Sequence, residues 1–280
     1  MVIRFKTNAK LNLTLDVTGV RADGYHEISS IFHSVNLADE ITLKTKNGNG
    51  NIIVQSDFGP CGEGNLAYKA AKLFLNFANL NRDVEIVIAK KIPLLSGLGG
   101  ASANAAGVLQ ALNKVSGEIL STDNLYALAL QLGADVPFCL TGGTALVGGI
   151  GEKIQLIGQQ NFHFVLVKSG EKKSTAKVYK MLDFAGAQKT NFTHNFMQKP
   201  HILSEKTINN VFKIVNPACE QILQDLRSIG AVVASLSGSG PTCFGIFEDE
   251  KSAKIAKNML KSTKNNVFYA KSSQNAIEFF

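Results

Sequence analysis

The stretch Pro-Leu-Leu-Ser-Gly-Leu-Gly-Gly-Ala-Ser-Ala, residues 93–103, decides the fold, because it joins a strand pattern to a helix pattern. On its upstream side, β-branched residues alternate along residues 84–88, which predicts a strand. On its downstream side, apolar residues between 105 and 112 recur at i, i+3, i+4 and i+7, which predicts an amphipathic helix. The stretch is therefore expected to be a glycine loop that opens a helix.

The three glycines of this loop make it a candidate anion site. A helix start offers unpaired backbone N–H groups and the positive end of the helix dipole, and glycine lets the backbone approach phosphate oxygens closely. The chain has no Gly-Lys-Ser or Gly-Lys-Thr, and Ser102 stands where the dinucleotide fingerprint needs its third glycine. The sequence therefore predicts a phosphate loop outside these two nucleotide-binding classes.

Length and composition describe a globular protein without a membrane segment. A chain of 280 residues suits two domains, and 45% hydrophobic with 18% charged residues is typical of an ordinary folded protein. No run of about 18 apolar residues is present, so we expect no transmembrane helix and no membrane partner. The first residues lack the pattern of a signal peptide, and we therefore expect a cytoplasmic location.

Cysteines, histidines and net charge exclude several kinds of site. The 4 cysteines form no Cys-x-x-Cys pair and the 5 histidines show no metal-ligand spacing, so we expect reduced, mostly buried thiols and no metal held by side chains. The net charge of +7 fits nucleic acid, a substrate with several phosphates, or a solvated lysine surface. Because the basic residues are dispersed, no nucleic-acid partner is expected.

The first half of the chain reads as strands followed by helices. Alternation at residues 11–16 and an extended run from Ile41 predict strands. Helical spacing predicts one helix that starts at Asn65 and another that is capped by Ser121 or Thr122 and ends at Gly133.

The second half begins at a domain boundary expected at residues 157–162, which separates domains 1–160 and 161–280. Asn216 and Pro217 are expected to be the N-cap and first residue of a helix. Further elements are expected as strands at 162–167, 231–236 and 242–247 and a last helix at about 250–262. Residues 183–206 show no pattern that assigns them. The order of the elements indicates an α+β protein.

Four short segments contain polar residues suited to chemistry. Each is weak evidence alone, since lysines on strands, aspartates in turns and glycine hairpins are common. The segments are Ala-Lys-Leu-Asn-Leu (9–13), Arg-Ala-Asp-Gly-Tyr-His-Glu (21–27), Gly-Ala-Asp-Val-Pro-Phe (133–138) and Leu-Ser-Gly-Ser-Gly (236–240).

Together with the loop at 93–103 and Asn-Leu-Ala-Tyr-Lys-Ala at 65–70, these segments resemble the GHMP kinase superfamily, whose signature is P-x-x-x-G-L-G followed by small residues. The resemblance implies a two-domain fold of the α+β class, with an N-terminal α/β domain, a ferredoxin-like C-terminal domain and the active site between them. It also implies a reaction, in which ATP phosphorylates the tertiary 2-hydroxyl of 4-diphosphocytidyl-2-C-methyl-D-erythritol, a step of non-mevalonate isoprenoid biosynthesis.

The resemblance assigns a catalytic pair. Asp135 is implied as the general base on the acceptor hydroxyl, with Lys10 as its charged neighbour. Phosphoryl transfer to an alcohol needs such a pair, because the hydroxyl proton must leave as the bond to phosphorus forms. A carboxylate beside an ammonium stays ionised, and the ammonium stabilises negative charge.

The resemblance also assigns binding residues. The substrate-binding residues it implies are Asn12, Tyr25, His26, Phe32, Thr175, Gly238 and Gly240, with Tyr25, His26 and Phe32 in a cytidine pocket. The ATP-binding residues it implies are Asn65, Pro93, Leu94, Leu95, Ser96, Gly97, Leu98, Gly99, Gly100, Ala101, Ser102 and Ala103. Mg²⁺ is expected with ATP and, because no protein carboxylate ligand is identifiable, is expected to be carried by the phosphates.

The loop departs modestly from the family pattern G-L-G-G-G-S-S-D. Ala101, Ala103 and Asn104 replace a glycine, a serine and an aspartate. Ala103 removes a hydroxyl that could contact phosphate, and Ala101 indicates that a positive φ is not required at that position. We expect the backbone to hold the phosphates here, and the intact Lys10 and Asp135 predict an active enzyme.

Other readings stay open from the sequence. Another GHMP small-molecule kinase, of homoserine or mevalonate type, is disfavoured by the Gly-Tyr-His and Ala-Lys-Leu-Asn segments. A binding-only descendant of the fold should have lost Lys10 or Asp135, and a non-catalytic nucleic-acid binder should show a recognisable motif. The oligomeric state is unknown from the sequence, with a monomer or a weak dimer expected.

Overall fold

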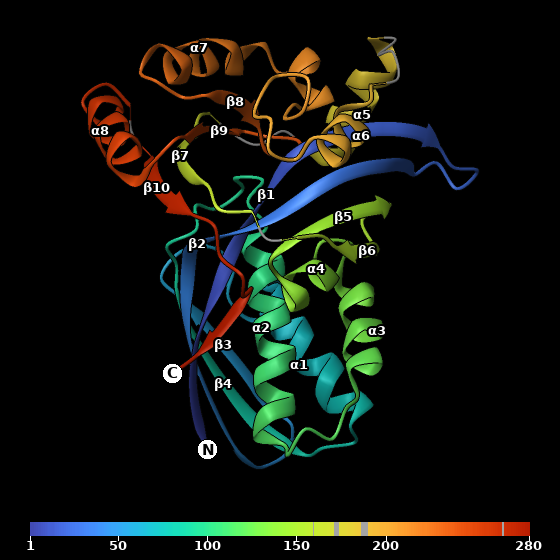
Figure 1. The fold of residues 1–280 in the computed structure, drawn as a ribbon. Coiled ribbons are helices and arrows are strands. Elements are labelled where there is room, and N and C mark those ends of the chain that lie inside the picture. Colours follow the sequence, from blue (N-terminus) through green and yellow to red (C-terminus); the bar gives the residue numbers. More distant parts are fainter. Residues whose placement is uncertain (159, 171–173, 186–189, 265) are drawn as a thin grey trace.

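The computed structural model describes residues 1–158, 160–170, 174–185, 190–264 and 266–280. Within these residues the chain forms two sheets, a larger one below and a smaller one above in Figure 1, each with helices packed against it. Gln159, within the expected domain boundary, lies outside the described residues. Mixed helices and strands confirm the α+β class.

The larger sheet has seven described strands, in the order β11-β1-β2-β4-β3, with β5 paired to β2 and β6 to β5. β1 and β2 form a long antiparallel hairpin whose end extends beyond the sheet in Figure 1. The strands are β1 (Val2–Val20), β2 (His26–Asn47), β3 (Ile52–Ser56), β4 (Arg82–Ala89), β5 (Thr144–Gly149), β6 (Lys153–Leu156) and β11 (Ile277–Phe279).

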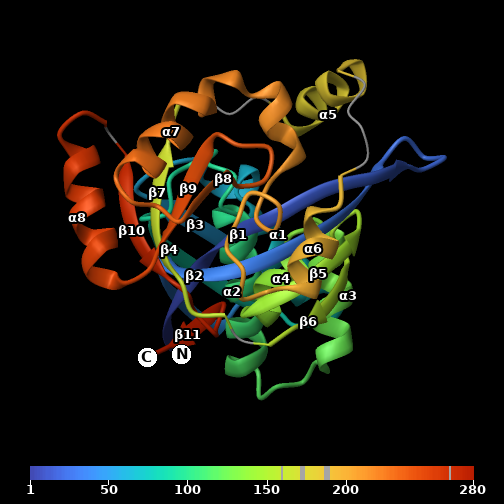
Figure 2. The ribbon, with the colours of Figure 1, turned by 45° about the horizontal axis from the view of Figure 1, so that its top comes forward.

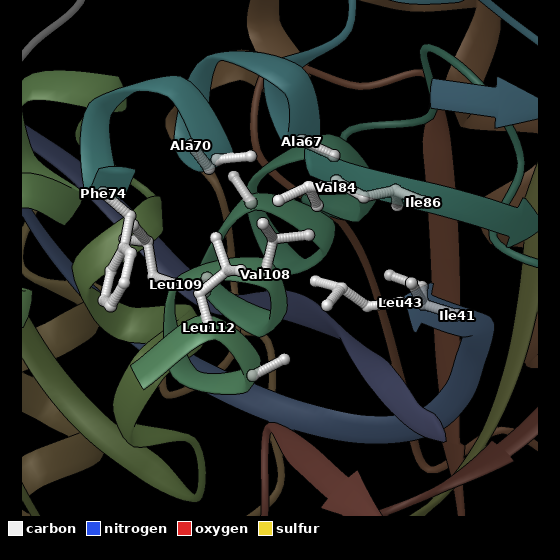
Figure 3. Close-up of a cluster of buried hydrophobic side chains, with 14 of the residues drawn as sticks. Ile41, Leu43, Ala67, Ala70, Phe74, Val84, Ile86, Val108, Leu109 and Leu112 are labelled. Atoms are coloured by element: carbon white, nitrogen blue, oxygen red, sulfur yellow. The ribbon is translucent and has the colours of Figure 1, made fainter. Parts of the chain in front are cut away.

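Four α-helices lie on one side of this sheet, with α2 at the centre and α3 packed mainly on the other three helices (Figure 1). They are α1 (Leu66–Phe77), α2 (Gly100–Val115), α3 (Thr122–Leu132) and α4 (Val136–Thr141), and the 3-10 turn Gly62–Gly64 precedes α1. Apolar side chains of α2, β2 and β4 share one buried cluster, in which Val108 comes from α2, Leu43 from β2 and Ile86 from β4, while Leu109 of α2 lies beside Phe74 of α1 (Figure 3). Full burial of such a side chain stabilises the fold by about 1.5–3 kcal/mol, so this cluster fixes α2 on the sheet.

The smaller sheet is antiparallel, in the order β10-β7-β9-β8. Its strands are β7 (His163–Lys168), β8 (Val233–Leu236), β9 (Thr242–Phe247) and β10 (Val267–Lys271). Its helical segments are α5 (Thr175–Phe184), α6 (Phe192–Gln198), α7 (Glu220–Ser228), α8 (Glu250–Lys261) and the 3-10 turns Val211–Val215 and Pro217–Cys219.

Alternation along β7 joins the two halves of the molecule. Val165 and Val167 pack in a buried cluster with residues of α5, α7 and α8. Phe164 and Leu166 pack instead in a second cluster with Leu11 of β1. Because successive side chains on a strand point to opposite faces, one face of the smaller sheet is covered by helices and the other rests on the larger sheet.

The chain returns to the larger sheet at its end. β11 pairs antiparallel with β1, and the Phe280 N–H donates to the Arg4 carbonyl at 3.1 Å. The two termini therefore lie close together, as Figures 1 and 2 both show.

Most elements expected from the sequence are present. Asn216 and Pro217 stand at the N-cap and first position of a helical segment, as expected, but its first turn is 3-10 and the Asn216 side chain makes no capping hydrogen bond. Pro217–Cys219 is this 3-10 turn and α7 begins at Glu220, while the Asn216 side chain donates to the Phe212 carbonyl. Within the stretch without a pattern, 183–206, the structure describes α6.

Candidate active site

The loop at 93–103 leads from β4 into α2, as its flanking patterns predict. Gly97 and Gly99 have φ of 81° and 72°, a backbone conformation that favours glycine. A Cβ at Gly97 would lie 2.8 Å from the carbonyl oxygen of Gly240, so the two glycine loops touch directly. No side chain caps α2. Its first backbone N–H groups lack intrahelical partners, which makes this end suitable for an anion.

Lys10 on β1 lies against this loop through both its backbone and its side chain. Its backbone N–H donates to the Leu98 carbonyl at 2.9 Å. A Cβ at Gly99 would lie 2.9 Å from Lys10 Cγ, so only glycine leaves room for the lysine stem. The strand and the loop are therefore held in a fixed relation.

The Lys10 ammonium is held by three groups. Its Nζ lies 3.4 Å from Asp135 Oδ2, donates to Asn12 Oδ1 at 2.8 Å, and sits 4.3 Å from the centre of the Phe32 ring. The lysine side chain is 5% exposed, whereas that of Asp135 is 38% exposed. The pair thus presents a carboxylate to solvent with a buried cation behind it.

Local sequence explains why Asp135 is available. Gly133 ends α3 and Val136 begins α4, so Asp135 occupies the N-cap position of α4. Its side chain makes no capping hydrogen bond there. The carboxylate is therefore directed to Lys10 rather than used by the helix.

A cavity of about 790 Å³ opens at this pair and extends between the two sheets. Lys10, Asn12 and Asp135 line one part of it, next to Gly97 and Ser102 of the loop. Of the substrate residues expected from the sequence, Asn12, Tyr25, His26, Phe32, Thr175 and Gly238 line it as well. A volume of this size suits a small molecule.

The far part of the cavity has an aromatic wall formed by the hairpin and α5, which lie on the same side of the molecule in Figures 1 and 2. The His26 ring lies 4.5 Å from that of Tyr179, and His26 Nε2 is 2.8 Å from Asp183 Oδ1. Tyr179 also packs edge-on against Phe212 at 4.8 Å. Burial, followed by the nearby Asp135 charge, raises the pKa of Tyr179 to about 12, so its hydroxyl stays neutral.

Comparison with known proteins gives the family. Residues 65–143 match the GHMP kinases N terminal domain and residues 193–266 match the GHMP kinases C terminal domain. A 4-diphosphocytidyl-2-C-methyl-D-erythritol kinase from Alkaliphilus metalliredigens is 39% identical over 265 residues, covering 91% of each chain. This chain belongs to the GHMP kinases. It is accordingly a small-molecule kinase.

Further relatives of this GHMP kinase agree. The 4-diphosphocytidyl-2-C-methyl-D-erythritol kinase of Clostridium beijerinckii is 34% identical, covering 95% of this chain and 98% of that protein. A crystal structure of 4-(cytidine 5'-diphospho)-2C-methyl-D-erythritol kinase superposes with a TM-score of 0.82 at 29% identity, covering 96% of this chain and 99% of the other. A homoserine kinase from Cytophaga hutchinsonii, with TM-score 0.75, 17% identity and coverage of 100% and 97%, shares the fold alone.

Some residues expected at the site do not line the kinase's cavity. Asn65 caps α1, where its Oδ1 accepts from the Ala67 N–H at 2.9 Å. Gly240 packs behind Gly97. Of the loop at residues 93–103, Gly97 and Ser102 line the cavity, and the other residues of the loop do not.

The three departures from the family loop have clear surroundings. Ala101 is the second residue of α2 and its φ is not positive, as expected from its side chain. Ala103 is buried. Asn104 is buried too, and its Oδ1 accepts a hydrogen bond from the Thr7 hydroxyl at 2.7 Å. Asn104 therefore ties α2 to β1 under the loop.

Sequence reasoning missed several residues at the cavity. Tyr179, Asp183 and Phe212 line it without having been singled out. Tyr179 lies four residues after Thr175 on α5, and this helical spacing is a signal that could have found it. Ser239 stands within the second glycine loop, whose motif was recognised only for its glycines.

Metal ligands, membrane-spanning helices and disulfides were each looked for among the described residues of the structure. They contain no group of three or more His, Cys, Asp or Glu side chains placed to hold a metal ion. Among the helices they form, none is both long and apolar enough to cross a membrane. Of the cysteines, Cys139, Cys219 and Cys243 are buried and Cys61 is exposed, and none of the four forms a disulfide.

Proposed function

We propose that this kinase transfers the γ-phosphoryl group of ATP to the 2-hydroxyl of 4-diphosphocytidyl-2-C-methyl-D-erythritol, in non-mevalonate isoprenoid biosynthesis. The observation that carries the proposal is the cavity, which has the Lys10–Asp135 pair at one end and an aromatic wall at the other. Relatives at 34–39% identity that bear this activity in their names support the same substrate.

The catalytic step follows from the pair. The hydroxyl oxygen attacks the γ-phosphorus, its proton passes to Asp135, and the bond from phosphorus to the bridging oxygen of ADP breaks. The Lys10 ammonium, 3.4 Å from the carboxylate, stabilises the negative charge that develops at the attacking oxygen.

The nucleotide phosphates bind at the start of α2 in this proposal. The uncapped N–H groups of the first turn, with the Ser102 hydroxyl at the cavity wall, are suited to phosphate oxygens. Mg²⁺ arrives with ATP, because the described side chains offer no group of metal ligands. When bound, the ion neutralises phosphate charge.

The cytidine base binds at the aromatic wall. Tyr25 is 61% exposed and lies with His26 and Tyr179 beside the cavity, so a flat pyrimidine gains stacking contacts there. Thr175, Asn12 and Gly238 then lie along the sugar and alcohol portions of the substrate. A cytoplasmic location and a monomer or weak dimer complete the proposal.

Turnover with three alcohols tests it. We expect ADP release from ATP and Mg²⁺ only with the diphosphocytidyl alcohol, and background release with homoserine or mevalonate. Preference for homoserine or mevalonate would assign the site to another GHMP kinase class. A folded protein that phosphorylates none of them would contradict the proposal altogether.

A further inference from the structure

A fully buried carboxylate lies at the entrance to the phosphate loop and has no part in the proposed mechanism. Asp39, on β2, is 0% exposed. Its Oδ1 accepts hydrogen bonds from the backbone N–H groups of Lys91 and Ile92, each at 2.8 Å, and its Oδ2 accepts one from the Lys90 ammonium. The three donors belong to residues 90–92, which lie between the end of β4 and Pro93, where the loop begins. Asp39 therefore fixes the backbone from which the loop departs.

The same residues reach the other end of the loop. A Cβ at Gly100, the first residue of α2, would lie 3.0 Å from Ile92 Cγ2 and 3.3 Å from Lys90 Nζ. The backbone N–H of Lys90 is held in addition by Asp57 Oδ1, at 2.9 Å. Both ends of the loop therefore rest on residues bound to Asp39, which links the position of this carboxylate to the backbone N–H groups at the start of α2.

Stability alone is a weak reason for this arrangement. The desolvation of two buried charges offsets most of their attraction, and neutral residues of similar volume are often as stable. The Lys90 ammonium also lies at a helix N-terminus, where positive charge is unfavourable. By contrast, Glu40 and Lys91 join the same two segments at the surface, in a pair 40% and 55% exposed.

We infer that Asp39 is a positioning residue of the nucleotide site, which acts by holding the Lys91 and Ile92 N–H groups and thereby setting the loop for ATP. This inference rests on the proposed function. It extends the site beyond the cavity wall to a residue that touches neither substrate.

Two double variants isolate the carboxylate oxygen. Asp39→Asn/Lys90→Met and Asp39→Leu/Lys90→Met both replace the buried ion pair with neutral residues of similar volume. Only asparagine keeps an oxygen that accepts from Lys91 and Ile92. Glu40→Gln, which breaks the adjacent surface pair, is the matched control. The readouts are the melting temperature, the equilibrium Kd for ATP, and KM for each substrate.

We expect the Leu/Met variant to bind ATP at least about tenfold more weakly, since small displacements of a binding loop are costly, with KM for the alcohol unchanged. The Asn/Met variant and the control should stay within about threefold of the wild type. Equal ATP affinities in the two double variants, or a parallel rise in the KM of the alcohol, would overturn the inference.

A replacement variant and a wild-type assay cover the cases in which a variant does not fold or the proposed reaction does not occur. If the Leu/Met variant does not fold, Asp39→Ala/Lys90→Met replaces it, because its smaller side chain lets water reach the two N–H groups. Wild-type protein that binds ATP but leaves the diphosphocytidyl alcohol unphosphorylated contradicts the proposed function, while the comparison of ATP Kd values still decides the role of Asp39.

Discussion

Asn12 orients the Lys10 side chain of the Lys10–Asp135 pair. Its Oδ1 accepts from Lys10, and its Nδ2 donates to the Ser30 hydroxyl at 3.1 Å. Because Ser30 donates its own proton to the Thr14 carbonyl, its oxygen is left to accept from Asn12. This order of donors holds the amide with its oxygen toward the lysine, so a single chain of bonds orients the ammonium beside Asp135.

Substitution of the carboxylate tests the catalytic assignment at this scale. Asp135→Asn keeps the shape of the side chain but cannot accept the hydroxyl proton. We expect kcat to fall at least about a hundredfold, the range for loss of a general base, with ATP affinity within about threefold of wild type. Steady-state kinetics and equilibrium ATP binding measure the two effects.

A melting temperature within a few degrees of wild type is the control for this variant. Were Asp135→Asn to unfold the protein, the carboxylate would have a structural role. Retention of kcat would remove Asp135 from the mechanism.

At the scale of elements, the sequence predicts those parts whose pattern is local. β4, the glycine loop and α2 follow directly from alternation, small residues and helical spacing, and Ser121 caps α3 as expected. Asn216 and Pro217 begin a helical segment as expected, but the Asn216 side chain bonds back to Phe212 instead of capping it, a contact that local spacing does not reveal. Asp39 is likewise visible only after β2 and β4 pair, since its partners lie more than fifty residues away.

The contact between the two glycine loops gives a prediction for this scale. In Gly97→Ala the new Cβ meets the carbonyl oxygens of Gly240 and Ser237 at 2.8 and 2.9 Å, both of them backbone atoms. The loops must separate, and we expect kcat/KM to fall at least about tenfold as the phosphate loop shifts relative to Lys10.

Gly117→Ala is the matched control for this change. Gly117 has a φ of 85°, close to that of Gly97, but a Cβ there meets nothing within 4 Å. It should lose about 1 kcal/mol of unfolding free energy from backbone strain and keep its activity. Equal kinetics in the two variants would show that the loop contact is unimportant for catalysis.

For the whole molecule, His33 is a buried link between the two sheets. Its Nδ1 and Nε2 lie 2.9 Å and 2.8 Å from the hydroxyls of Thr144 and Ser272, and its ring packs near Phe162 and Phe164. Burial lowers the pKa of His33 from 6.5 to about 3, so the folded protein keeps this imidazole neutral.

This burial predicts how the unfolding free energy depends on pH. Below pH 6.5, His33 binds a proton in the unfolded chain but stays neutral in the folded chain. The unfolding free energy therefore decreases as the pH falls from 6.5 toward 3. At pH 5 the loss from His33 is about 2 kcal/mol. Urea unfolding at pH 7.5 and pH 5 measures it, with His33→Gln as a comparison that should lack this contribution. The same pH dependence in both proteins would contradict the assignment.

The proposed phosphoryl transfer depends on the whole molecule, because the cavity forms where both sheets meet. ³¹P NMR of the diphosphocytidyl alcohol incubated with ATP, Mg²⁺ and the protein tests it most directly. We predict one new phosphomonoester resonance that appears together with ADP, while the two diphosphate resonances of the substrate persist. Inorganic phosphate without a new phosphomonoester, or cleavage of the substrate diphosphate, would contradict the proposed transfer.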